Sequence, residues 1–295
     1  MEWPIIDSYG LQFHMFADDI QIYTVYRENS NTLSTLSSCL NDIKDWSRKN
    51  YLKLNDTKTK FMNIAPGLSK TSVLCFSPFN EVVEFEEKVK NLGFILDKKL
   101  SLKDQVSRVC QLGFYMLKNL WRISLKLENI PTKIQLVHSC VLCHIDYCNS
   151  LYICLPQKEI MRLQRLMNAS VRFIYNLSKR DYDISITEYL KKCHFLPVKL
   201  RINFKICAMV YNCLQGNAPE YMTDMLRYKS SLECLRIRND STLLDMPCLA
   251  KLNYKNSKFS IAAPTLWNKL PMTIRTSPTL TIFKKKLKTY YFDQF

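Results

Sequence analysis

Residues 11–25 read LQFHMFADDIQIYTV, and the fold predicted for the first part of the chain is based on this stretch. Apolar and polar residues alternate on both sides of the adjacent acids Asp18 and Asp19. A period of two is typical of half-buried strands, so the pattern predicts a β-hairpin with the acid pair at its tip. Aspartate is also common in turns, so an ordinary hairpin turn is the alternative interpretation of the pair.

Outward from this hairpin, residues 31–50 carry large apolar side chains at steps of three and four, which predicts a helix. Residues 52–64 and 82–96 return to strand-like patterns, the second around turn residues Asn91 and Gly93. From residue 104 the period becomes helical, and little strand pattern follows. The predicted helices lie at about 104–122, 132–150, 160–174, 199–215, 264–270 and 280–291. We therefore expect an α+β fold with two parts, residues 1–100 and residues 101–295.

Charge separates the same two parts. The net charge is +16; residues 1–100 carry 12 basic and 13 acidic residues, whereas residues 101–295 carry 30 and 13, a balance of +17. This excess favours a polyanionic partner, nucleic acid before an anionic membrane, and a basic protein without such a partner is the alternative. The five glycines lie too far apart to build a dinucleotide-binding or P-loop motif, which excludes most enzymes that rely on those loops.

Cysteine and hydropathy patterns indicate an intracellular protein, nuclear or cytoplasmic, that is neither secreted nor membrane-bound. No signal-peptide pattern opens the chain and no apolar run approaches the roughly 18 residues of a membrane span. The twelve cysteines are therefore expected to be reduced. The densest group, from Cys140 to Cys154, gives two alternatives: buried thiols or a structural zinc module.

The acid pair is the candidate catalytic site. Two neighbouring carboxylates repel each other, and a divalent cation relieves the repulsion. Mg²⁺ prefers carboxylate oxygens and keeps open positions for a substrate phosphate. Two such ions clamp the attacking and leaving oxygens of a phosphoryl transfer.

The motif Phe16-Ala17-Asp18-Asp19 resembles the aromatic-Ala-Asp-Asp metal site of reverse transcriptases encoded by non-LTR (LINE-type, jockey-like) retrotransposons. Further segments follow in that family's order along nearly the whole chain. They are Trp46, Leu54-Asn55, Lys58-Thr59, Asn91–Phe94 with Asp97, Leu136–His138, Asp146–Tyr152, Leu155-Pro156, Leu163–Arg165, Leu196–Val198 with Arg201-Ile202, Ala218–Tyr221, Ala263–Asn268, Leu270-Pro271, Phe283-Lys284 and Leu287-Lys288.

This resemblance implies RNA-directed DNA polymerase chemistry on an RNA template and a DNA primer or target. The fold would be the C-terminal part of a palm, followed by a mainly helical, basic thumb and C-terminal region. Asp18 and Asp19 would hold Mg²⁺, and a deoxynucleoside triphosphate would be the small-molecule substrate. Lys58 would neutralise or protonate the leaving pyrophosphate, with a solvated lysine as the alternative. Asn91, Leu92 and Gly93 would shape the primer grip, with an ordinary turn as the alternative.

Three arginines add a candidate nucleic-acid surface. Arg162, Arg165 and Arg172 lie opposite the apolar stripe of the helix predicted at residues 160–174. Such a face suits a phosphate backbone, and a solvated helix face is the alternative.

One departure from the family pattern bears on activity. A polymerase palm uses another metal-binding aspartate from an earlier strand, and the only acids before Asp18 are Glu2 and Asp7. We therefore expect a truncated reverse transcriptase that is inactive on its own. A non-catalytic RNA- or DNA-binding remnant is the first alternative, and the zinc module is the second.

Overall fold

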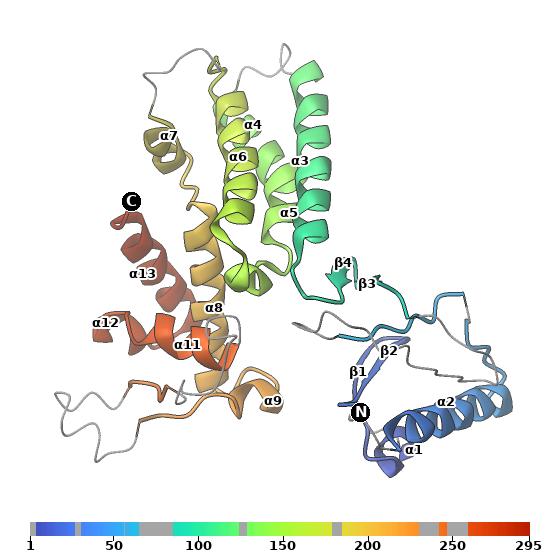
Figure 1. The fold of residues 1–295 in the computed structure, drawn as a ribbon. Coiled ribbons are helices and arrows are strands. Elements are labelled where there is room, and N and C mark those ends of the chain that lie inside the picture. The colour runs from blue at the N-terminus through green and yellow to red at the C-terminus, as the bar shows by residue number, and fades with distance from the viewer. Residues whose placement is uncertain are drawn as a thin grey trace. The chain divides into compact units, whose positions relative to one another are not determined.

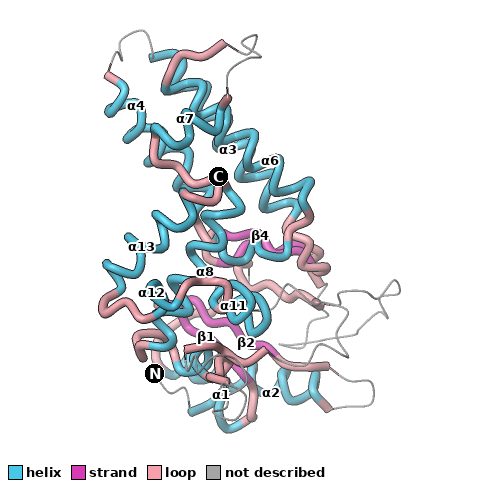
Figure 2. Tube along the Cα trace, turned by 90° about the vertical axis from the view of Figure 1, so that its left-hand side faces the viewer, coloured by secondary structure: helices cyan, strands magenta, loops and turns pink. Residues whose placement is uncertain are grey.

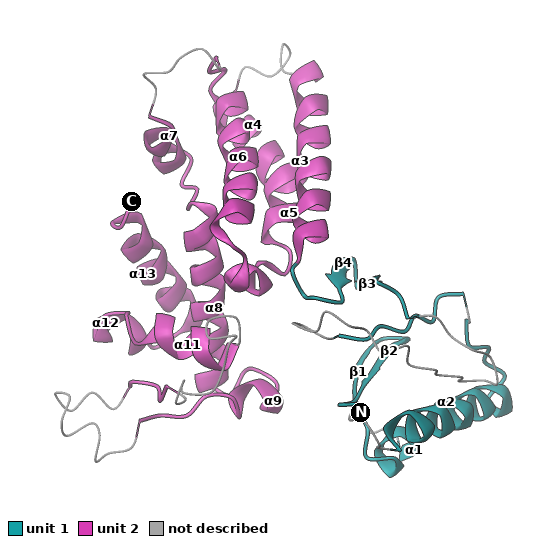
Figure 3. Cartoon of the chain, viewed as in Figure 1, with its two compact units in different colours: residues 1–101 teal, residues 102–295 magenta. Residues whose placement is uncertain are grey.

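The computed structural model describes residues 4–26, 31–55, 57–64, 85–123, 129–178, 185–229, 242–246 and 259–295. The chain divides into two compact units, residues 1–101 and residues 102–295 (Figure 3). In the described ranges the strands belong to unit 1 and form two separate two-stranded antiparallel sheets, whereas unit 2 is helical (Figure 2). The molecule is thus helix-rich with two small sheets, as an α+β fold requires.

The first sheet is the hairpin predicted around the acid pair. Strand β1 (Gln12–Phe16) pairs with β2 (Asp19–Tyr23) in a register that places Phe16 opposite Asp19. Ala17 and Asp18 form the two-residue loop. Ala17 has φ +53°, a left-handed conformation that costs a non-glycine residue roughly 1–2 kcal/mol.

The hairpin is anchored by helices on one of its faces. Helices α1 (Pro4–Ser8) and α2 (Thr32–Lys49) supply buried side chains of the unit 1 core, and the half-buried Phe13, Ile20 and Ile22 of the hairpin pack against that core. The Tyr9 hydroxyl donates to Asp42 Oδ2 at 2.6 Å, which ties the chain after α1 to α2. Helix α2 confirms the helix predicted at residues 31–50.

The strand predicted over residues 52–64 is wrong for the described residues of that stretch. Asn55 turns the chain instead, because its Oδ1 accepts hydrogen bonds from Thr57 Oγ1 (2.6 Å) and from the Lys58 amide (3.2 Å). Such an Asx turn competes with strand pairing. The segment that follows contacts Glu86 in two ways. The Glu86 amide donates to the Phe61 carbonyl at 2.8 Å, and Lys60 forms an ion pair with the Glu86 carboxylate at 2.6 Å.

The second sheet pairs β3 (Lys88–Asn91) with β4 (Phe94–Asp97) around a two-residue loop. Leu92 (φ +45°) and Gly93 (φ +84°) both adopt positive φ, as tight hairpin turns of the I′ type require. Of the pattern over residues 82–96, positions 82–84 lie outside the described residues, and Phe85 lies outside the strands.

Asp97 turns the chain at the end of unit 1. Its Oδ1 accepts from the amides of Lys99 (3.1 Å) and Ser101 (3.0 Å), and Oδ2 accepts from Ser101 Oγ (3.3 Å). The residue is 8% exposed, so these bonds also meet the demand of its carboxylate for partners. The chain therefore makes an ordered turn just before unit 2 begins.

Unit 2 begins with α3 (Lys103–Ile123), which packs side by side with α6 (Gln157–Ile174) (Figure 1). Gly113 of α3 faces Leu166 of α6 so closely that a Cβ atom on Gly113 would lie 2.3 Å from Leu166 Cδ2. A glycine here permits the helices to approach. The apolar stripe predicted for residues 160–174 is confirmed, since all of its members are buried: Ile160, Leu163, Met167, Val171 and Ile174.

Between α3 and α6 the chain forms one continuous helical stretch and then a short turn of 3₁₀ helix. Helix α4 (Ile130–Val137), the π-helix η3 (His138–Leu142) and α5 (Cys143–Asp146) follow one another without a break, and the 3₁₀ helix η4 (Asn149–Cys154) comes after them. Cys148, at φ +51°, lies between α5 and η4. The single helix predicted at 132–150 is therefore right for most of its length but ends at Asp146.

The C-terminal half of unit 2 is built on α8 (Val198–Leu214), which is contacted by α11 (Phe259–Trp267) and α13 (Leu280–Phe292) (Figure 1). Tyr211 of α8 stacks on Phe283 of α13 at 4.6 Å between ring centroids, and Trp267 stacks on Phe283 at 5.7 Å. The remaining helices of the described ranges are α7 (Ile186–Lys192), α9 (Glu220–Thr223) and α12 (Met272–Arg275).

Candidate functional site

The acid pair lies at the exposed end of the first hairpin. Asp18 belongs to the loop and Asp19 is the first residue of β2, so one side chain leaves the turn and the other leaves the strand. Both are exposed, and neither carboxylate makes a hydrogen bond or ion pair with the described part of the chain. All four carboxylate oxygens are therefore open to an external ligand.

Asp19 shares its face of the hairpin with exposed residues, away from the core of unit 1. The register places Asp19 opposite Phe16 and His14 opposite Gln21. Phe16 is 66% exposed. His14 Nε2 lies 3.1 Å from the Tyr23 hydroxyl, with the two ring centroids 5.4 Å apart. An exposed aromatic face beside two unpaired carboxylates is suited to contact with a ligand.

Within the described ranges, no three His, Cys, Asp or Glu side chains converge to form a metal site. Asp18 and Asp19 offer oxygen ligands of the kind that Mg²⁺ binds, and one or two carboxylates together with substrate phosphates suffice for a single ion. The donor chemistry therefore fits one Mg²⁺. Two ions close together would need additional ligands.

Lys58 follows the Asn55 turn. Its amide donates to both the carbonyl oxygen (3.1 Å) and Oδ1 (3.2 Å) of Asn55, and its exposed ammonium has no carboxylate partner among the described residues. The backbone of Lys58 is thus fixed while its charge remains free to act. Asn91, Leu92 and Gly93 form the tip of the second hairpin, with Asn91 as the last residue of β3.

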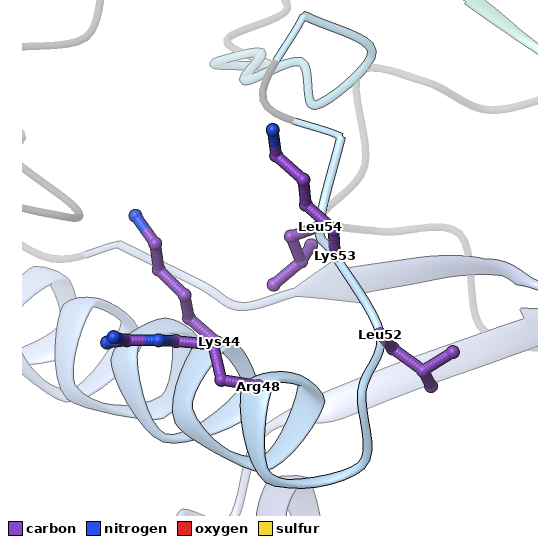
Figure 4. Close-up of a pocket in the computed structure, with 5 residues that line it drawn as sticks. All are labelled: Lys44, Arg48, Leu52, Lys53 and Leu54. Atoms are coloured by element: carbon purple, nitrogen blue, oxygen red, sulfur yellow. The ribbon is translucent and has the colours of Figure 1, made fainter.

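A basic groove in unit 1 was not predicted from the sequence. It has a volume of about 450 Å³ and lies where the end of α2 faces the segment that follows the helix. Figure 4 shows Lys44 and Lys53 extending from the two sides of this groove, with Arg48 along the helix. The sequence signal was a pair of basic residues at a step of four, followed by a lysine, but this pattern also describes an ordinary solvated helix end.

Two of the three candidate arginines are engaged within unit 2. Arg162 Nη1 contacts Glu159 at 2.7 Å and its Nη2 donates to Ser107 of α3 at 3.0 Å. Arg172 Nη1 donates to the Ser178 carbonyl at 2.6 Å. Arg165 is exposed and makes no such contact with the described residues. Of the three, Arg165 is the one whose donors are all open to a phosphate.

The cysteines of residues 140–154 do not gather around a common point. Cys143 Sγ donates to the Ser139 carbonyl at 2.8 Å and Cys154 Sγ donates to the Leu151 carbonyl at 3.2 Å. Burial raises the pKa of both thiols, which favours the neutral thiol over the thiolate that zinc requires. The zinc alternative thus receives no support from this geometry.

A second pocket, of about 430 Å³, lies in unit 2. It brings together His138 of η3, Asp146 of α5 and Asn149 of η4 with the end of α7, the start of α8 and α13. Several of the segments that resemble the retrotransposon family meet here, although none was predicted to form a pocket. The meeting of segments so far apart in sequence depends on how the helices pack, which the sequence patterns do not specify.

Comparison with known proteins finds a family match within unit 1. Residues 2–96 match the family described as reverse transcriptase (RNA-dependent DNA polymerase). This match includes the acid-pair hairpin, α2, Lys58 and the second hairpin up to residue 96. No curated protein and no solved structure matches the chain. Among the described helices, none combines the length and apolar character needed to cross a lipid bilayer.

Proposed function

We propose that the chain is part of the polymerase of a non-LTR retrotransposon, with the end of the palm in unit 1 and a basic thumb and C-terminal region in unit 2. The observation that carries the proposal is the exposed Asp18-Asp19 hairpin inside the stretch that matches the reverse transcriptase family. The charge of +17 on residues 101–295 supports an RNA template and a DNA primer as partners.

In this proposal Asp18 and Asp19 hold Mg²⁺ through their unpaired carboxylates. When bound, the ion would supply charge neutralisation at a nucleotide phosphate during attack by a primer 3′-hydroxyl. Lys58 supplies a positive charge, and the Asn55 turn already fixes the backbone of this residue. Asn91, Leu92 and Gly93 present a tight hairpin tip to the primer.

The same geometry supports inactivity of the chain by itself. A polymerase that uses two ions needs a further carboxylate, and within the described residues none accompanies the pair. Two carboxylates can hold one Mg²⁺ weakly but cannot position two ions and a nucleotide together.

Two measurements on the full chain test the proposal. Titration with Mn²⁺, followed by electron paramagnetic resonance, should show one weak site that Asp18→Asn/Asp19→Asn abolishes. The control Asp45→Asn changes an exposed acid of α2 whose ion pair with Arg48 is long, at 3.8 Å, and should leave that site intact. Equal Mn²⁺ binding by the wild type and the double variant would contradict the metal role.

Primer extension on an RNA template with Mg²⁺ tests the expected inactivity of the chain by itself. The wild type should extend no more than the double variant. Extension that Asp18→Asn abolishes would overturn the expected inactivity and would support the catalytic role of the pair.

A further inference from the structure

The second pocket collects positive charge from two helices. Arg201 and Lys205 enter from α8, and Lys288 enters from α13. Among the described residues that line the pocket, Asp146 is the one carboxylate, so these residues carry a formal charge of +2 when histidine is counted as neutral. Like charges gathered at one place repel, and this repulsion is relieved when an anion binds between them.

Asp146 is already committed to Arg201. The Arg201 Nε donates to Asp146 Oδ1 at 2.8 Å, and Nη2 contacts Oδ2. This side-on pair fixes the guanidinium plane, and the third nitrogen, Nη1, has no hydrogen-bond partner in the described part of the chain. Arg201 thus keeps a donor that is fixed in place.

The two lysines pair with no carboxylate of the residues that the structure describes. Neither the Lys205 nor the Lys288 ammonium contacts an acid in the described ranges, and Lys288 Nζ instead lies 5.7 Å from the ring centroid of Phe292. Although the Lys288 side chain is exposed overall, partial loss of water around its ammonium, followed by the neighbouring Arg201 charge, lowers its pKa.

Asn149 gives an independent indication of a missing ligand. The residue is 4% exposed and lines the same pocket, and its Oδ1 is buried without a hydrogen-bond partner among the described residues. Its Nδ2 faces Asp146 Oδ1 at 3.4 Å, so exchanging the amide oxygen and nitrogen would bring two oxygens together. A buried acceptor left unpaired costs about 1–3 kcal/mol, which a ligand carrying an N–H or O–H donor would recover.

We infer that this pocket binds a single phosphate of a single-stranded nucleic acid, with Lys205, Lys288 and Arg201 Nη1 on the phosphate oxygens and Asn149 Oδ1 accepting from the attached nucleotide. The pocket volume of about 430 Å³ falls within the usual range for small-molecule sites. The inference shares with the proposed function only its nucleic-acid partner. The site itself lies outside residues 2–96 and involves neither Asp18 nor Asp19.

The test uses fluorescence anisotropy of a short, fluorescein-labelled single-stranded RNA with the full chain, in the absence of divalent metal and nucleotides. The pocket variant is Lys205→Gln/Lys288→Gln. The matched control, Lys199→Gln/Lys284→Gln, removes one exposed lysine from each of the same two helices outside the pocket. All four lysines are exposed, so both variants should fold, and circular dichroism checks this.

The pocket variant should bind the RNA at least about tenfold more weakly than the wild type, since two charged hydrogen bonds to the phosphate are removed. Its slope of log Kd against log salt should fall by about 0.7 in total, because one phosphate of a single strand is no longer neutralised. The control should change affinity by less than about threefold. An equal weakening in the two variants would overturn the inference, because the effect would then follow from net charge.

Inorganic phosphate distinguishes the source of the anion. It should displace the RNA only at a far higher concentration than an unlabelled RNA does. Displacement by inorganic phosphate at the same concentration as by RNA would overturn the assignment to nucleic acid. Because the assay contains no metal, its failure leaves the Mn²⁺ test of Asp18 and Asp19 unaffected, and failure of that test leaves this one unaffected.

Discussion

At the scale of the residue, several side chains from the family-like segments hold helices together. Gln164 of α6 accepts from the Val198 amide at 2.9 Å through Oε1, so it satisfies one of the free amides that open α8. Asn268 exchanges two hydrogen bonds with the backbone of Leu244, at 2.8 and 2.9 Å. The Trp267 indole donates to the Thr242 carbonyl at 3.0 Å. These residues thus serve packing, which their sequence context alone did not distinguish from ligand binding.

Cys207 leads to a prediction about alkaline stability. This thiol of α8 is fully buried, with Sγ 3.5 Å from the Tyr291 hydroxyl, and burial raises its pKa from 9.0 to about 12. The folded state therefore holds a proton that the unfolded chain releases above about pH 9. The stabilisation is complete below pH 9 and declines as the pH rises toward 12. Urea unfolding between pH 8 and pH 11 should show this decline.

At pH 8 the Cys207→Ala variant should have a free energy of unfolding lower by on the order of 1 kcal/mol, as for the removal of one buried methyl group. Above pH 9 its free energy of unfolding should decline less steeply than that of the wild type. The control Cys140→Ala, at a half-buried thiol, should keep the wild-type slope. If the free energy of unfolding of Cys207→Ala falls with pH as steeply as that of the wild type, Cys207 is not the cause of the decline.

At the scale of the element, apolar periodicity and the turn residues of the two hairpins predicted the structure well, whereas the turn at Asn55 was missed. The acid-pair hairpin, α2, α6 and α8 follow apolar spacings that the sequence displays directly. The strand expected at residues 52–64 fails because Asn55 forms hydrogen bonds with its own neighbours. The pocket of unit 2 could not be predicted, because Arg201 and Lys288 meet only through the packing of α8 on α13.

The contact between α3 and α6 gives a prediction at the same scale. Gly113→Ala should lower the free energy of unfolding, because the new methyl group would collide with Leu166, which is fully buried. Overpacking costs about 1–3 kcal/mol, and the better helix propensity of alanine offsets about 1 kcal/mol of it. Urea midpoints measure the balance.

The double variant Gly113→Ala/Leu166→Ala separates collision from other effects. The alanine methyl should occupy part of the space that Leu166 leaves, so the double variant should be less destabilised than the two single changes added together. Strict additivity would show that Gly113 has another role.

At the scale of the whole molecule, the two units have separate cores and very different charge. Unit 1 buries Ile6, Leu11, Cys39 and Ile43 as one cluster, and unit 2 has its own core along α3, α6 and α8. We expect two calorimetric unfolding transitions. Ile43→Ala should move only the transition of unit 1 to lower temperature, because large-to-small core changes lower the free energy of unfolding by about 2–5 kcal/mol.

Leu163→Ala, at a fully buried position of α6, is the matched change in unit 2 and should shift only the other transition. A single transition that both variants shift would show that the chain unfolds as one cooperative body.

The turn at Asp97 has a consequence for how a ligand reaches unit 1. The chain enters unit 2 directly after this ordered turn, so the units are joined by a short connection. A strand of nucleic acid held by unit 2 would therefore reach unit 1 intramolecularly, at an effective concentration on the order of millimolar if both units can engage it together. Under the proposed function, avidity of this kind would bring the acid-pair hairpin to a polymer that unit 2 already holds.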